Sequence, residues 1–242
     1  MSKTIAFFGA SGGVGLATLK HTLAAGHHCI ALCRVPSKLS TLFPASTTPN
    51  LTIVAGNAHD EAAVSKCLVA SSGKLVDTIV FTIGASPVMK GMLPSIDDPE
   101  VCQKGMATLV STLNSLRGTG VAGAPHVIVC STTGMSKFGR DIPLAMVPLY
   151  HVGLKVPHQD KAIMEERLVA SGEGFTIIRP SLLVNGASDK KIRVGIEDPK
   201  TGRESKAIGY AISREDVGKW VAESLILQRD ANYDNKIAMI TW

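Results

Sequence analysis

Short runs of apolar, often β-branched residues recur along the whole chain, and segments long enough for helices separate them. The runs are apolar at successive positions, which is typical of strands buried between two helical layers. The seven runs are KTIAFFG, HCIALCR, LTIVAG, DTIVFTIG, HVIVCST, FTIIRP and KIAMITW. Helices are expected between them, at residues 14–25, 36–43, 59–71, 98–117, 158–171 and 214–228.

This alternation predicts an α/β fold, a doubly wound parallel sheet flanked by helices, with right-handed crossovers. The length suits one domain over residues 1–242, with a small substrate-binding portion at about 180–242. Three longer irregular segments, 84–97, 132–157 and 185–212, follow the fourth, fifth and sixth strands. Because ligands bind beyond the carboxyl ends of parallel strands, these segments are the expected substrate loops.

Charge and composition narrow the class of partner. The net charge is +5 and the pI is about 9.0, yet the densest basic cluster is only Lys190, Lys191 and Arg193. A phosphorylated small molecule therefore explains the charge better than nucleic acid does. The five cysteines form no CxxC and no metal-ligand grouping, so no metal is expected. Without a leader-like start or an apolar run of ~18 residues, we expect a cytoplasmic protein that does not enter a membrane.

The sequence GASGGVG, at residues 9–15, lies directly between the first strand and the first helix. Gly9 would allow a tight turn, Gly12 would let a pyrophosphate approach the backbone, and Gly15 would let the helix pack on the strand. The amides of Ser11, Gly13 and Val14 would then face the phosphates at the helix N-terminus. This context predicts a dinucleotide site. The alternative is a glycine-rich turn without a ligand.

Residues at the end of the second strand indicate which dinucleotide the site would bind. NAD enzymes place an acid about 20 residues beyond the glycines to bind the ribose hydroxyls. Here Arg34 stands nineteen residues after Gly15, with Lys38 close behind it. A guanidinium can bind a 2′-phosphate bidentately, so NADP(H) is the predicted cofactor. The alternative for Arg34 is a solvated cation at a strand end.

Two further strand ends complete the predicted cofactor site. Asn57 follows the third strand and is placed to touch the adenine, although loop asparagines are often turn formers. Thr82, Ile83 and Gly84 follow the fourth strand, where small residues would let the nicotinamide half lie against the backbone.

These motifs give the chain a resemblance over nearly its whole length. GASGGVG, the LCR strand end, AGNAHD, KAIMEERLVASGEGFTIIRPSLL and ISREDVGKWV resemble the atypical short-chain dehydrogenase/reductases, in particular the NmrA-like and biliverdin-reductase-B-like proteins. The resemblance implies one Rossmann domain with NADP across the strand ends. It does not imply one substrate, because the group includes reductases of flavins, quinones and natural products as well as non-catalytic regulators.

The catalytic residues that the resemblance implies are only partly present. Ser131 matches the serine that polarises the substrate, and Lys161 matches the lysine that binds the nicotinamide ribose. The tyrosine of YxxxK would fall at Pro157, which has no proton to donate. Tyr150 remains as a possible donor from the preceding loop, and it could equally be a packing residue. The corner at Pro180, after the sixth strand, would lie beside the carboxamide of the nicotinamide.

Methionines and a phenylalanine from the irregular segments are the predicted substrate walls, although they could simply pack the loops. They are Met89, Met92, Met135, Phe138 and Met146. The sequence thus predicts an NADPH-dependent reductase of a hydrophobic small molecule, with homo-oligomerisation left open. A non-redox isomerase or cyclase is the first alternative, and an NADP(H)-binding regulator without catalysis is the second.

Overall fold

A nine-stranded sheet runs through the computed structural model, which describes residues 2–85, 87–90 and 93–242. Its strand order is β11-β10-β13-β8-β7-β4-β1-β2-β3. The strands are β1 (Thr4–Phe8), β2 (His28–Cys33), β3 (Leu51–Ala55), β4 (Thr78–Phe81), β7 (His126–Cys130), β8 (Phe175–Pro180), β10 (Arg193–Asp198), β11 (Gly202–Arg203) and β13 (Lys236–Thr241). The strands from β3 to β13 pair in parallel, and β10 and β11 close the edge in antiparallel pairing. The predicted doubly wound α/β fold is confirmed.

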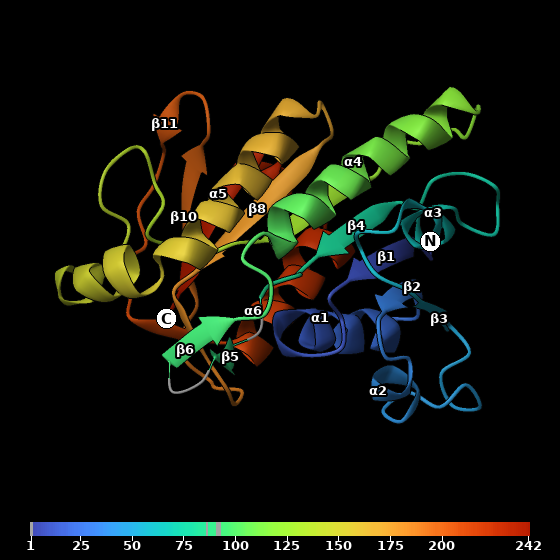
Figure 1. Ribbon diagram of the computed structural model, residues 1–242, viewed down its shortest axis with the longest axis horizontal. Coiled ribbons are helices and arrows are strands. Elements are labelled where there is room, and N and C mark those ends of the chain that lie inside the picture. The colour runs from blue at the N-terminus through green and yellow to red at the C-terminus, as the bar shows by residue number, and fades with distance from the viewer. Residues whose placement is uncertain (1, 86, 91–92) are drawn as a thin grey trace.

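Helices cover both faces of the sheet (Figure 1). They are α1 (Gly13–Ala24), α2 (Ser37–Ser40), α3 (Glu61–Leu68), α4 (Val101–Gly118), α5 (Lys155–Ala170) and α6 (Arg214–Trp220). α1 and α6 pack on one face, and α3, α4 and α5 pack on the other. Because side chains alternate along a strand, Phe7 enters the core beneath α1 and α6 while Phe8 enters the core beneath α3 to α5.

The helix ends follow the expected chemistry. Gly26 adopts φ +79° just after α1, a left-handed conformation that glycine adopts without a steric penalty. Ser213 begins α6, and its hydroxyl accepts a hydrogen bond from the Asp216 amide at 2.9 Å. Among the described residues, no helix combines the length and hydropathy needed to cross a membrane.

The three segments expected to be irregular contain additional structure, which corrects the prediction. β5 (Pro87–Lys90) and β6 (Leu93–Ile96) form a hairpin within 84–97. Residues 132–157 contain a 3₁₀ turn, Leu144–Met146, and a π-helical turn, Leu149–Gly153, before α5. The region 185–212 supplies β10, β11 and the start of β12 (Ala211–Ser213), which pairs in parallel with β9 (Leu182–Val184). β9 with β12 and β10 with β13 pair across long stretches of sequence, so local patterns did not reveal those strands. The β5–β6 hairpin is a local pairing that the prediction also missed.

The predicted substrate-binding portion at about 180–242 is not a separate unit. Its strand β13 lies inside the main sheet between β8 and β10, and its helix α6 packs on α1. Two of its residues, Leu183 and Arg214, reach the pocket described below. A role of this portion in substrate binding stays a prediction.

Candidate active site

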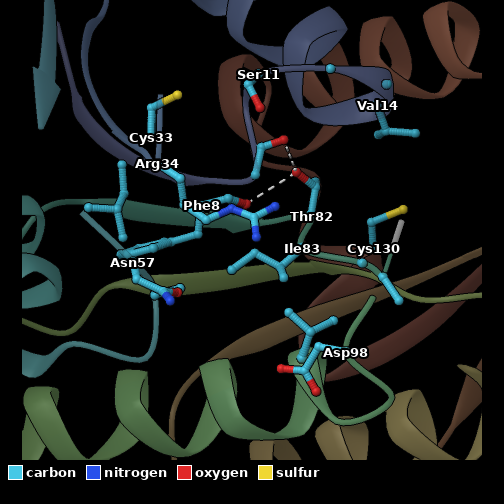
Figure 2. Close-up of a pocket in the computed structure, with 18 of the residues that line it drawn as sticks. Phe8, Ser11, Val14, Cys33, Arg34, Asn57, Thr82, Ile83, Asp98 and Cys130 are labelled. Atoms are coloured by element: carbon cyan, nitrogen blue, oxygen red, sulfur yellow. Dashed lines mark hydrogen bonds between the residues drawn. The ribbon is translucent and has the colours of Figure 1, made fainter. Parts of the chain in front are cut away.

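A pocket of about 590 Å³ lies at the carboxyl ends of β1, β2, β4 and β7. Figure 2 shows its walls: Ser11 and Val14 on one side, Arg34 and Asn57 at one end, Cys130 at the other, and Asp98 opposite the glycine loop. The pocket brings together most of the residues predicted from the sequence. They are Gly9, Ser11, Gly12, Gly13, Val14, Arg34, Asn57, Thr82, Ile83, Gly84, Ser131 and Lys161.

The glycine loop is fixed against the end of β4. The Thr82 hydroxyl lies 3.2 Å from both the Phe8 and Gly9 carbonyl oxygens, to which it can donate a hydrogen bond. Gly9 adopts φ +96°, and a Cβ there would come within 2.8 Å of the Thr82 backbone. A Cβ at Gly15 would overlap the Thr82 hydroxyl and lie 2.5 Å from the Gly9 carbonyl oxygen. Gly15 therefore serves this packing and does not itself line the pocket.

The start of α1 faces the pocket as an open cradle. Gly12 precedes the helix, the first turn carries no acid, and no described side chain accepts a hydrogen bond from the amides of that turn. A Cβ on Gly12 would meet no atom of the described residues within 4 Å. Unpaired amides and the partial positive charge of a helix N-terminus fit a pyrophosphate group. The residues present thus fit a dinucleotide.

The end of the pocket at β2 and β3 carries the predicted adenine-side residues. Arg34 is exposed, and among the described residues no carboxylate lies within ion-pair distance of its guanidinium. Asn57 and His59 line the same end. Lys38 lies on α2 with an exposed side chain and is not among the lining residues.

Ser131 and Lys161 meet at the opposite end. The Lys161 Nζ donates hydrogen bonds to the carbonyl oxygens of Cys130 at 3.0 Å and Ser131 at 3.3 Å. The Ser131 hydroxyl oxygen is buried and makes no hydrogen bond with any described residue. A buried hydroxyl without a protein partner is costly, which is consistent with a polar ligand atom at this point of the pocket.

Asp160 holds the helix that carries Lys161. Its two carboxylate oxygens accept hydrogen bonds from the amides of Cys102 and Gln103, each at 2.9 Å. Asp160 therefore caps α4 from α5, and no pairing with Lys161 is needed to explain it. This link fixes the start of α5 beside β7.

Tyr150 lies away from the pocket lining and is buried. Its phenol ring centroid lies 5.5 Å from that of His158, and a Cβ on Gly134 would collide with the ring. Burial raises the pKa of the phenol above its ordinary value, and a hydrogen bond with Thr133 opposes that shift. Tyr150 thus occupies a packed position. α5 begins at Lys155, three residues before the predicted start at residue 158, so Pro157 falls in the first turn, where proline is tolerated.

Hydrogen bonds within the protein occupy the corner at Pro180. The Pro180 carbonyl accepts hydrogen bonds from the amide and the hydroxyl of Thr133, at 3.1 and 3.3 Å. Its neighbour Arg179 is buried in ion pairs with Glu165 of α5 at 2.5 Å and Glu197 of β10 at 3.0 Å. Neither Pro180 nor Arg179 lines the pocket.

The predicted substrate walls do not gather at the pocket. Met135, Phe138 and Met146 are absent from its lining, and the Phe138 ring lies against Gly202 of β11. The Met89 side chain and Met92 lie outside the described residues. The apolar lining comes instead from residues at or near strand ends, including Ile83 after β4, Cys130 at the end of β7 and Leu183 in β9.

Sequence reasoning missed several lining residues, chiefly Asp98, Leu183 and Arg214. Each depends on how distant segments pack, and only the family-like ISRED segment drew attention to Arg214. Within the described part of the chain, no group of three or more His, Cys, Asp or Glu side chains is placed to hold a metal ion.

Comparison with known proteins identifies the family. A family model described as NAD(P)H-binding matches residues 9–226, nearly the whole chain. The chain belongs to this NAD(P)H-binding family. The family binds NAD(P)H, which confirms the class of cofactor predicted from the glycine loop.

Curated relatives agree along the full length. The chain is 42% identical to Reductase pytE of Aspergillus terreus, over 99% of this chain and 98% of the relative. It is 32% identical to Oxidase pynE of Aspergillus niger, over the whole of both. The protein is thus an NAD(P)-dependent oxidoreductase.

Solved structures confirm the fold. A short-chain dehydrogenase/reductase of Veillonella parvula in complex with NADP superposes with a TM-score of 0.73 at 16% identity, over 100% of this chain and 95% of the other. The anaerobilin reductase ChuY of Escherichia coli O157:H7 superposes with a TM-score of 0.66 at 17% identity, over 98% and 96%.

Proposed function

We propose that this NAD(P)-dependent oxidoreductase uses NADPH to reduce a hydrophobic small molecule at a carbonyl or conjugated carbonyl group. The buried hydroxyl of Ser131, which has no hydrogen-bond partner among the described residues, is the observation that carries the proposal, because a polar ligand atom at this end of the pocket would satisfy it. The likeness to a reductase over the full length supports the same reaction class.

The choice of NADPH rests on Arg34. The side chain lies at the end of β2 with no described acid to neutralise it, which suits a 2′-phosphate. NADPH, when bound, supplies the hydride. The protein orients the reacting groups. The Lys161 ammonium donates hydrogen bonds to the carbonyl oxygens of Cys130 and Ser131 at the end of β7, and these contacts fix the backbone beside Ser131.

The substrate class follows from the lining beside Ser131. The side chains of Ile83, Cys130 and Leu183 at this end carry no charge, and the Lys161 ammonium is hydrogen-bonded to backbone carbonyls. An apolar body with one hydrogen-bonding oxygen therefore matches this end. Ser131 would donate a hydrogen bond to that oxygen, and water would supply the proton that the missing tyrosine does not.

The test is NADPH oxidation with a panel of quinones, flavins and conjugated carbonyls, repeated with Ser131→Ala. Loss of one positioned donor lowers turnover by roughly 10²-fold, so we expect that loss here. Ser111→Ala, on the outer face of α4, is the control and should be unchanged. Tight NADPH binding with no turnover of any acceptor would favour a non-redox or regulatory role instead.

The reverse direction uses the same site. One relative is an oxidase, so the panel includes NADP⁺ with hydroxyl compounds. The faster direction identifies whether the hydride leaves or enters the cofactor.

A further inference from the structure

Arg214 is a cation in the pocket that the site described so far does not use. It is the first residue of α6 and lines the pocket on the side of the glycine loop. A Cβ built on Gly13 would lie 3.6 Å from its Cδ and 3.9 Å from its Nε, so the arginine stem runs past the loop.

Two contacts fix this position. Gly218, one turn along α6, lets the helix press against α1: a Cβ there would come within 2.8 Å of the Thr18 amide nitrogen and 2.9 Å of the Val14 carbonyl. The Asn185 side-chain oxygen accepts a hydrogen bond from Arg214 Nη1 at 2.8 Å. The guanidinium is thereby oriented by a neutral partner and keeps its charge unpaired.

Arg214 lines the same pocket as the glycine loop and Cys130 at the end of β7. The Arg214 charge opposes the rise in the Cys130 thiol pKa that burial causes, as Lys161 also does. Among the described residues, no carboxylate lies within ion-pair distance of Arg214. A cation that lines a pocket and has no acidic partner is suited to an anionic ligand group.

We propose that Arg214 binds the pyrophosphate of the cofactor from the α6 side, opposite the amides of α1, and that Asn185 positions it. The inference rests on the proposed NADPH-dependent function. The pocket then holds three side-chain cations with separate roles: Arg34 for the 2′-phosphate, Arg214 for the pyrophosphate and Lys161 for the ribose end.

The test compares three ligands by calorimetry: NADPH, NADH and adenosine 2′-monophosphate, which has no pyrophosphate. Arg214→Gln should weaken NADPH and NADH by the same factor, about tenfold or more, as expected for a charged hydrogen bond. Its affinity for adenosine 2′-monophosphate should not change. Arg34→Ala should show the opposite pattern, with losses for NADPH and adenosine 2′-monophosphate and none for NADH.

Matched variants exclude a folding effect. Lys219→Gln removes an exposed cation from the same helix and should leave all three affinities unchanged. Arg214→Lys should recover part of the loss, and Asn185→Ala should weaken both dinucleotides less than Arg214→Gln does.

Two results would overturn the assignment: unchanged NADPH and NADH affinities in Arg214→Gln, or an equal loss for adenosine 2′-monophosphate. Failure of the unmodified protein to bind NADPH would instead contradict the proposed function itself.

Discussion

Single residues at the pocket divide into those that face the ligand and those that hold the site in place. Ser131 and Lys161 lie at the lining, whereas Tyr150 is buried behind Gly134 and contacts His158. The family resemblance predicted Lys161 at the site although the tyrosine of YxxxK is replaced by Pro157. The position of Tyr150 could not be predicted, because it depends on how residues 132–154 fold over the sheet.

Substitution of Tyr150 and Lys161 tests this division. Tyr150→Phe should keep most of the turnover, because it removes only a hydroxyl that bonds Thr133. Lys161→Ala should lower turnover about tenfold or more, since the end of β7 loses its anchor and the proposed contact with the ribose is removed. Steady-state rates decide the matter, with the exposed Lys155→Ala as the control. An inactive Tyr150→Phe beside a healthy Lys161→Ala would make the tyrosine the donor.

Among the elements, the glycine loop shows two distinct uses of the same residue type. Gly15 and Gly9 are required by the close approach to Thr82, whereas Gly12 leaves space open above the start of α1. The sequence spacing predicted the tight turn at Gly9 and the close packing at Gly15, because strand, loop and helix are consecutive. Approach of a pyrophosphate to Gly12 stays a prediction.

Two alanine variants should separate packing from ligand binding. Gly15→Ala should lower the free energy of unfolding by ~1–3 kcal/mol, because the added methyl overlaps Thr82. Gly12→Ala should change stability by less than about 1 kcal/mol and yet abolish most NADPH binding, because its methyl enters the phosphate cradle. Denaturant titration and calorimetry measure the two effects. Equal losses of stability in Gly12→Ala and Gly15→Ala would show that Gly12 is also part of the packed core.

Elements built from distant partners escaped the sequence patterns. The β9–β12 pair joins residues that lie nearly thirty positions apart. β10 pairs with β13 in antiparallel orientation, with Val194 opposite Ile240. Arg214 was missed for the same reason: α6 reaches the glycine loop by packing on α1, at the other end of the sequence.

For the whole molecule, a buried histidine links stability to pH. His126, at the start of β7, lies 2.8 Å from the Thr176 hydroxyl and 3.1 Å from Arg229, with Asp234 beyond. Burial, and then the Arg229 charge, lowers its pKa from 6.5 to about 4, while Asp234 opposes the shift. The folded protein therefore binds fewer protons than the unfolded chain between these values.

The stabilisation from neutral His126 is complete above pH 6.5 and is lost as the pH falls towards 4. Its full size is on the order of 3 kcal/mol. We expect the free energy of unfolding to decrease over this window, and His126→Gln to flatten the slope even if it is less stable at neutral pH. Urea titrations at several pH values measure both slopes. Parallel slopes would mean that His126 is already protonated in the folded state.

The position of β13 also has a consequence for synthesis of the protein. Residues 236–241 form an interior strand with β8 on one side and β10 on the other, although they are translated after both. A nascent chain that has not yet released these residues from the ribosome presents two open strand edges, one of them the apolar β8. Such edges invite pairing with other chains, so the interval before release is when this protein is most exposed to aggregation and most in need of a chaperone.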